Sequence, residues 1–243
     1  MKLAKPDLNH VPPSHHWEFK SFMPGARFIR IVDHEKSVDP STGRPRYSPT
    51  DFNPTLVLDK PHVRGRFSAR RHRDRSERYS YLYLGELVKD ERLALLECID
   101  VLSLGRTEND GYRLLDEASV QNLSFAYITL KRATTLLDIS TEPFAGVFKA
   151  NLDTLGGRNH RMTRRWARYF RKVAPHVDGL YYRPAKYGTD ASGGNVVLFA
   201  EHEQNGDMIE AEHTTVKLTE KAGVARLVAL GKDLRLAYTG GVA

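Results

Sequence analysis

Cysteine is nearly absent from this 243-residue sequence, in which Cys98 is the only one, so no intrachain disulfide can form. The lack of disulfides is typical of a reducing compartment, and we expect a cytoplasmic protein. No apolar run approaches the roughly 20 residues that a membrane helix needs. Met1–Pro13 also lacks the apolar core of a secretory signal. The sequence therefore argues against a disulfide-stabilised, secreted or membrane-spanning protein.

Two kinds of functional motif are also missing. There is no Gly-x-Gly-x-x-Gly turn, which argues against a Rossmann-type dehydrogenase. The histidines near the N-terminus, His10, His15 and His16, do not have the spacing of a zinc site, and no cysteine accompanies them. We therefore expect no metal cofactor.

Positive charge is in excess, because 37 Lys and Arg residues outnumber 30 Asp and Glu residues and give a formal net charge of +7. A basic surface favours anionic partners such as nucleic acid, a phosphorylated small molecule or an acidic protein. The most basic run, Arg64–Arg78, is interpreted as a solvated loop, a phosphate-contacting loop or a docking surface. In Arg158–Val173, Met162, Trp166 and Phe170 recur at helical spacing, which predicts an amphipathic helix. We favour an ordinary arrangement for this helix, in which the apolar stripe packs in the core and the basic residues face solvent. The alternative is that the basic face binds nucleic acid.

Short apolar and aromatic runs between Gly- and Pro-rich segments predict strands, with a few longer helices among them. We predict one α+β domain over residues 26–243, with a twisted, mixed but mostly antiparallel sheet and surrounding helices. Residues 1–25 are predicted to form an irregular N-terminal arm, and Ser103–Leu115 a connector. The expected strands are Ala26–Val32, Tyr81–Leu84, Ser124–Leu130, Thr135–Asp138, Asp178–Tyr182, Val196–Phe199, Thr214–Leu218 and Leu234–Tyr238; the expected helices are Asp90–Leu102, Arg158–Val173 and Lys221–Leu230.

The stretch from Tyr81 to Leu102 organises the rest of the prediction. It opens as an aromatic strand that Gly85 can break, and it turns helical at Asp90, a potential N-cap. Apolar residues occupy nearly every side of that helix, so it should be largely buried. Glu97 lies in its middle, and a buried carboxylate is costly unless it is paired, hydrogen-bonded or used in function.

The order of these parts resembles the RES-domain toxins of bacterial toxin–antitoxin pairs. In that family a Gly-Arg-aromatic turn precedes a strand bearing tyrosine, and a helix reading roughly Ala-Leu-x-Glu follows. The matching segments here are Gly65-Arg66-Phe67, Tyr83 and Ala94-Leu95-Leu96-Glu97, with Asp178-Gly179-Leu180 and Gly193-Gly194 in the C-terminal half. The resemblance implies an ADP-ribosyltransferase-like fold and a protein that consumes NAD+ without a metal. It also implies a cognate antitoxin that covers the pocket, and a homo-oligomer, with nucleic acid engaged only through the antitoxin.

The resemblance also implies roles for individual residues. Arg66, Tyr83 and Glu97 are expected to meet in one catalytic pocket. Glu97 would stabilise the positive charge that develops on the ribose when the nicotinamide bond breaks, and Glu86, on a predicted exposed turn, is the alternative carboxylate. Arg66, and after it Arg30, would bind the pyrophosphate. Tyr83 would stack on the nicotinamide ring.

The sequence departs from the family at one position. The family's serine usually follows two residues after the tyrosine of the Asp-Gly-aromatic strand, and Pro184 stands there, without a hydroxyl or an amide hydrogen. Ser192 or Asn195 could supply a polar group to the ligand from the nearby loop. Two other hypotheses stay open: a basic nucleic-acid-binding protein, and a RES-like protein without turnover.

Overall fold

The computed structural model describes residues 6–7, 11–33, 79–88, 91–98, 113–148, 160–183, 193–201 and 207–240. The chain divides into two compact units. Unit 1 comprises Met1–Ala26, Phe52–Tyr83 and Leu130–Ile209. Unit 2 comprises Arg27–Asp51, Leu84–Thr129 and Glu210–Ala243. No described helix is long and apolar enough to cross a membrane.

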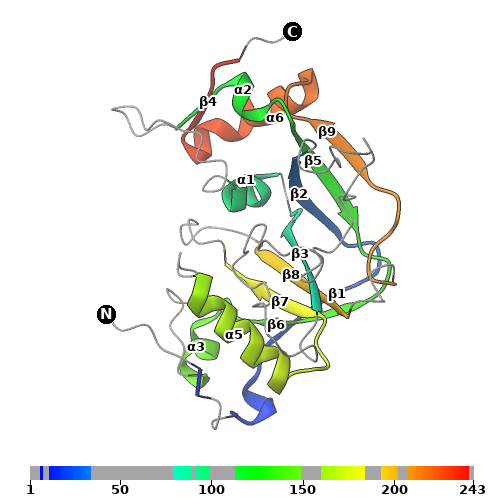
Figure 1. Ribbon diagram of the computed structural model, residues 1–243, viewed down its shortest axis with the longest axis vertical. Coiled ribbons are helices and arrows are strands. Elements are labelled where there is room, and N and C mark those ends of the chain that lie inside the picture. The colour runs from blue at the N-terminus through cyan, green and yellow to red at the C-terminus, as the bar shows by residue number, and fades with distance from the viewer. Residues whose placement is uncertain are drawn as a thin grey trace, which may run out of the picture. The chain divides into compact units, whose positions relative to one another are not determined.

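Unit 1 is built on a mixed sheet. In the described part of this unit the hydrogen-bonded strand order is β1-β6-β7-β8-β3, in which β6 and β7 run parallel while β1–β6 and β7–β8 are antiparallel. The bounds are β1 Phe19–Phe22, β6 Thr134–Asp138, β7 Gly179–Tyr182 and β8 Asn195–Glu201, with Tyr79–Tyr83 of strand β3 (Tyr79–Glu86) (Figure 1). Its helices are the short 3-10 turn η1 (Ser14–His16), α3 (Glu142–Val147) and α5 (His160–Val173).

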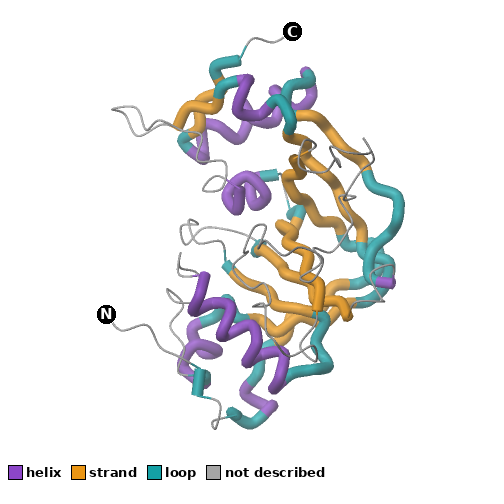
Figure 2. The backbone as a smooth tube through the Cα atoms, in the orientation of Figure 1, coloured by secondary structure: helices purple, strands orange, loops and turns teal. Residues whose placement is uncertain are grey.

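Register aligns buried side chains in rows across the central strands of this sheet. Leu137 pairs with Leu180 and Leu180 with Val197, so a row of fully buried aliphatic side chains crosses three strands on one face. The apolar stripe of helix α5, including Trp166 and Phe170, belongs to the same core cluster. The prediction of a core stripe on this basic helix is therefore confirmed. Figure 2 shows the helices and strands of the chain by colour.

Unit 2 carries an antiparallel sheet with helices on one face. The strand order is β3-β2-β5-β9, and the bounds are β2 Arg27–Asp33, β5 Leu123–Thr129 and β9 Thr214–Lys217, with Leu84–Glu86 of β3. Its helices are α1 (Arg92–Cys98), α2 (Glu117–Val120) and α6 (Lys221–Leu234), and two parallel strands, β4 (Arg113–Leu115) and β10 (Leu236–Tyr238), pair separately. Ile29 and Phe125 pack with Leu95 and Leu227 in one core cluster, so α1 and α6 cover the same side of β2 and β5.

The α+β class and the mostly antiparallel mixed sheet are confirmed. The expected strands and helices are found within a few residues of their predicted bounds wherever the structure describes them. Helix α6 runs to Leu234 instead of Leu230, and it ends because Arg235 adopts a left-handed conformation, with φ of 52°, and its N–H bonds back to Gly231. The boundary of the predicted domain at residue 26 stays a prediction.

Three expectations are wrong. Residues 1–25 are not irregular throughout, because Phe19–Phe22 forms strand β1 against β6 and Trp17 belongs to the core. Gly85 does not break its strand, since β3 continues to Glu86 and Gly85 pairs with Ile29. The connector Ser103–Leu115 ends in strand β4, and helices α2 and α3 were not expected.

Candidate active site

Helix α1 carries the predicted catalytic carboxylate. Leu93, Ala94 and Leu95 are almost completely buried, as the sequence predicted for this helix. Glu97 lies within α1, near its C-terminal end. The predicted N-cap, Asp90, lies outside the described residues, so that assignment stays a prediction. Among the described residues, the amides of Ala94 and Leu95 donate to the carbonyl of Glu91, at 3.1 and 3.3 Å.

Gly85 lets α1 approach strand β3 closely. A Cβ at this position would lie 2.9 Å from the Cβ of Leu93 and 3.1 Å from the amide nitrogen of Ala94. Both distances are shorter than ordinary van der Waals contact. The glycine therefore allows the helix to pack closely against the strand, and it does not break the strand as expected.

Arg30 and Glu86 lie on the face of the unit 2 sheet that is opposite to α1. Side chains alternate along a strand, and Ile29 and Ile31 on either side of Arg30 pack in the cluster that contains Ala94 of α1. Glu86 pairs with Phe28 and is half-buried within β3, so the expectation of an exposed turn is wrong for it. The assignment of Arg30 to phosphate binding stays a prediction.

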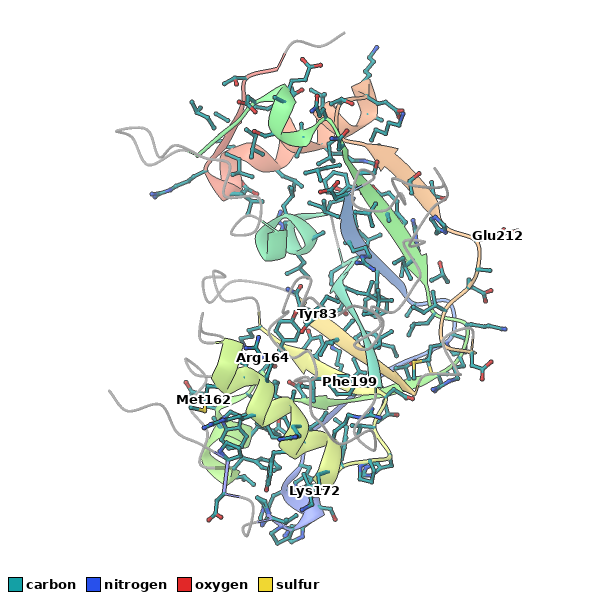
Figure 3. The ribbon with its side chains drawn as sticks, viewed as in Figure 1. Tyr83, Met162, Arg164, Lys172, Phe199 and Glu212 are labelled. Carbon is teal, nitrogen blue, oxygen red and sulfur yellow. The ribbon has the colours of Figure 1, made fainter. Side chains whose placement is uncertain are left out.

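Tyr83 and Asn195 belong to unit 1. Tyr83 is partly buried and packs against the core cluster that contains Trp166 and Phe199 (Figure 3). Asn195 begins β8, pairs with Tyr182 and is completely buried. Because Tyr182 and Val197 face the same cluster, Asn195 lies on the face of the sheet that α5 covers.

The entry to β8 has a fixed backbone. Gly193 has a φ of +101°, in the region that favours glycine, and a Cβ on Gly194 would lie 2.6 Å from the ring of Tyr181. This geometry holds Asn195 at the start of the strand. Ser192, Arg66 and Pro184 lie outside the described residues, so their predicted roles stay predictions.

Sequence reasoning missed a polar cluster in unit 2 formed by Glu91, Tyr127 and Arg226. The hydroxyl of Tyr127 donates to Oε1 of Glu91 at 2.7 Å, and Nε of Arg226 lies 3.2 Å from the same oxygen. Nη1 of Arg226 also donates to the hydroxyl of Tyr127. The three residues lie 36 and 99 positions apart, so no local motif could have revealed them.

Electrostatics keeps Tyr127 in its protonated form. Burial, followed by the hydrogen bond and the charge of Glu91, raises the pKa of Tyr127, while the guanidinium groups of Arg226 and Arg27 act in the opposite direction. The guanidinium carbons of Arg226 and Arg27 lie 5.2 and 5.9 Å from the centroid of the ring. The hydroxyl is therefore a permanent donor to Glu91 at ordinary pH.

A comparison with models of protein families shows the family to which this chain belongs. The model of the RES domain matches residues 32–219, well over half of the chain. The chain belongs to the RES domain family. Among solved structures, a chain of the M. tuberculosis MbcT–MbcA toxin–antitoxin complex is similar, with 11% sequence identity and a TM-score of 0.46 over 91% of this chain and 93% of that chain. No curated protein matches the sequence significantly.

Proposed function

We propose that this RES-domain protein is a toxin that cleaves the nicotinamide–ribose bond of NAD+. The observation that carries this proposal is the family match over residues 32–219. It coincides with the ordered motifs Gly65-Arg66-Phe67, Tyr83 and Ala94-Leu95-Leu96-Glu97. Two of those three motifs lie on elements that the structure describes, β3 and α1.

In the proposed reaction the bond between the ribose C1′ and the nicotinamide nitrogen breaks, and nicotinamide leaves with the bonding electron pair. The ribose then carries developing positive charge. A carboxylate beside it stabilises that charge, and a preorganised contact of this kind is worth more than the same contact in water. Glu97 is the proposed carboxylate. Attack by water on C1′ gives ADP-ribose and releases one proton; attack by phosphate or by a protein side chain gives the corresponding adduct.

Different parts of NAD+ are proposed to contact residues of different chemical types. Arg66, with Arg30 as second choice, neutralises the pyrophosphate, because a guanidinium can donate two parallel hydrogen bonds to phosphate oxygens. Tyr83 offers a flat ring to the nicotinamide. Asn195 or Ser192 supplies the polar group that Pro184 cannot, and Asn195 is a completely buried polar residue at the start of β8.

The proposal extends to partners. A protein that consumes NAD+ would harm the cell that makes it, so we propose that a cognate antitoxin covers the pocket and that the toxin self-associates in the cytoplasm.

The test is incubation of purified, antitoxin-free protein with NAD+, followed by chromatography for nicotinamide. Parallel reactions with and without phosphate, and with adenine-labelled NAD+ and cell extract, separate hydrolysis, phosphorolysis and ADP-ribosyl transfer. Release of nicotinamide that disappears in Glu97→Gln supports the proposal. A folded protein that releases none under all three conditions overturns it and favours a RES-like protein without turnover.

A further inference from the structure

Glu91 stands where helix α1 begins. Its backbone carbonyl accepts the amides of Ala94 and Leu95, and its side chain reaches strand β5 through Tyr127 and helix α6 through Arg226. Arg226 in turn donates to Tyr127, so the three side chains close a triangle. The first turn of α1 is thereby tied to two other elements of unit 2.

The triangle is better protected from solvent than a second polar link between the described parts of α1 and α6. The side chain of Glu91 is only 12% exposed and that of Arg226 is 36% exposed. The ion pair of Arg92 with Asp233, at 3.4 Å, has side-chain exposures of 31% and 58%. Exposed ion pairs contribute little, whereas hydrogen-bonded charges shielded from water contribute more. Of these two polar links between α1 and α6, the triangle is the one expected to fix the position of α1.

Helix α1 needs such a support because it is short. Seven residues, Arg92–Cys98, are too few for a helix to be stable through its own propensity, so its position depends on tertiary contacts. Glu97 follows Glu91 by six positions, which is about 9 Å along the helix axis. A change in the angle or register of the first turn is therefore carried directly to Glu97.

We propose that Glu91, Tyr127 and Arg226 are positioning residues that hold helix α1 so that the carboxylate of Glu97 meets the ribose of the substrate. This inference rests on the proposed function, because Glu97 has a catalytic role only there. The three residues themselves need not touch the substrate.

The first experiment compares NAD+ cleavage by Tyr127→Phe, Glu91→Ala and Glu91→Gln, measured well below their melting temperatures. We expect kcat to fall about ten- to a hundredfold in Tyr127→Phe and Glu91→Ala, since small displacements of a reacting group have effects of this size. KM should change little. Glu91→Gln, whose amide oxygen can still accept from Tyr127, should recover part of the loss. Asp233→Ala, which removes the exposed link between the same two helices, is the matched control and should keep the wild-type kcat.

A second experiment separates positioning from general stability. The substitution Tyr127→Phe is placed in the wild-type protein and in the Glu97→Gln variant. If Tyr127 acts through Glu97, the loss in kcat in the second background should shrink to less than about twofold, because residues that act as one unit are not additive. An equal loss in both backgrounds overturns the proposal. Wild-type kcat in both Tyr127→Phe and Glu91→Ala overturns it as well.

Hydrogen exchange distinguishes failure of this inference from failure of the proposed function. Absence of nicotinamide release by the wild-type protein refutes the function. Independently of activity, Glu91→Ala should speed amide exchange at Ala94 and Leu95 in α1 and leave α5 of unit 1 unchanged. Unchanged exchange in α1 overturns the positioning role whether or not the protein cleaves NAD+.

Discussion

The packing of α1 on Gly85 gives a prediction whose size follows from distances. In Gly85→Ala the new methyl group would lie 2.9 Å from the Cβ of Leu93 and 3.2 Å from its carbonyl carbon. Carbon atoms pack best at about 3.5–4.0 Å, so the first contact is too short by about 0.6–1.1 Å. The obstructing atoms are a backbone carbon and a Cβ, which no side-chain rotation can move. Helix α1 must therefore shift away from β3.

The cost can be estimated from that shift. Overpacking a core by one methyl group destabilises by about 1–3 kcal/mol, and each kcal/mol lowers Tm by about 2–4 °C in a chain of this size. We expect Tm to fall by about 2–12 °C. Because the shift also moves the helix that carries Glu97, NAD+ cleavage should fall by up to about a hundredfold.

Calorimetry gives Tm, and nicotinamide release is measured at a temperature where the variant is fully folded. The matched control is Gly146→Ala in α3, where an added Cβ would meet nothing within 4 Å. That exchange should instead stabilise by about 0.5–1 kcal/mol, since alanine favours a helix over glycine. If Gly85→Ala keeps both the wild-type Tm and the wild-type rate, the argument that α1 is held tightly against β3 is refuted.

Three further predictions follow from the proposed site. Glu97→Gln should lower kcat by about a hundred- to a thousandfold, with a smaller effect on NAD+ binding. Arg66→Ala should do the reverse and mainly weaken NAD+ binding. Steady-state kinetics of the folded variants distinguishes an effect on kcat from an effect on binding. Above pH about 10, the ordinary tyrosine pKa, unfolded Tyr127 loses its proton while the folded residue keeps it, because its folded pKa is raised. Stability should therefore fall as pH rises above that value, and more steeply in wild type than in Tyr127→Phe, as a series of melting curves can show. Expression without the antitoxin should deplete cellular NAD+ and arrest growth, and co-expression of a neighbouring small gene should restore both.

Much of the fold was predictable because its signals are local. Strand β5 has a nearly continuous apolar run that includes Phe125, and the stripe of Trp166 and Phe170 has the period of a helix. Asp138 was expected to end its strand, and β6 does end there. These features depend only on residues close in sequence, so no knowledge of tertiary contacts was needed.

Several of the errors share one cause, which is a partner that lies far away in the sequence. The segment Phe19–Phe22 is too short for its sequence to predict a strand. It forms a strand because it pairs with β6, which lies more than a hundred positions later in the chain. Gly85 is predicted to break its strand until Ile29 of strand β2 is seen to pair with it. Likewise, Glu91 reads as an ordinary acidic residue in a first helical turn, because Arg226 is supplied by the last helix of the chain.

The contacts of Glu91 with Tyr127 and Arg226 also help to decide whether Glu91 or Glu97 is the carboxylate that stabilises the ribose. A group that stabilises developing positive charge must have negative charge to offer. Oε1 of Glu91 already accepts from Tyr127 at 2.7 Å and lies 3.2 Å from a guanidinium nitrogen, so its charge is largely compensated by Arg226. Bringing that carboxylate to a ribose would break both its ion pair with Arg226 and the hydrogen bond that it accepts from Tyr127. Glu97 therefore remains the better candidate, and the comparison of Glu91→Gln with Glu97→Gln tests the choice directly: a greater loss of kcat in Glu91→Gln would reverse the two roles.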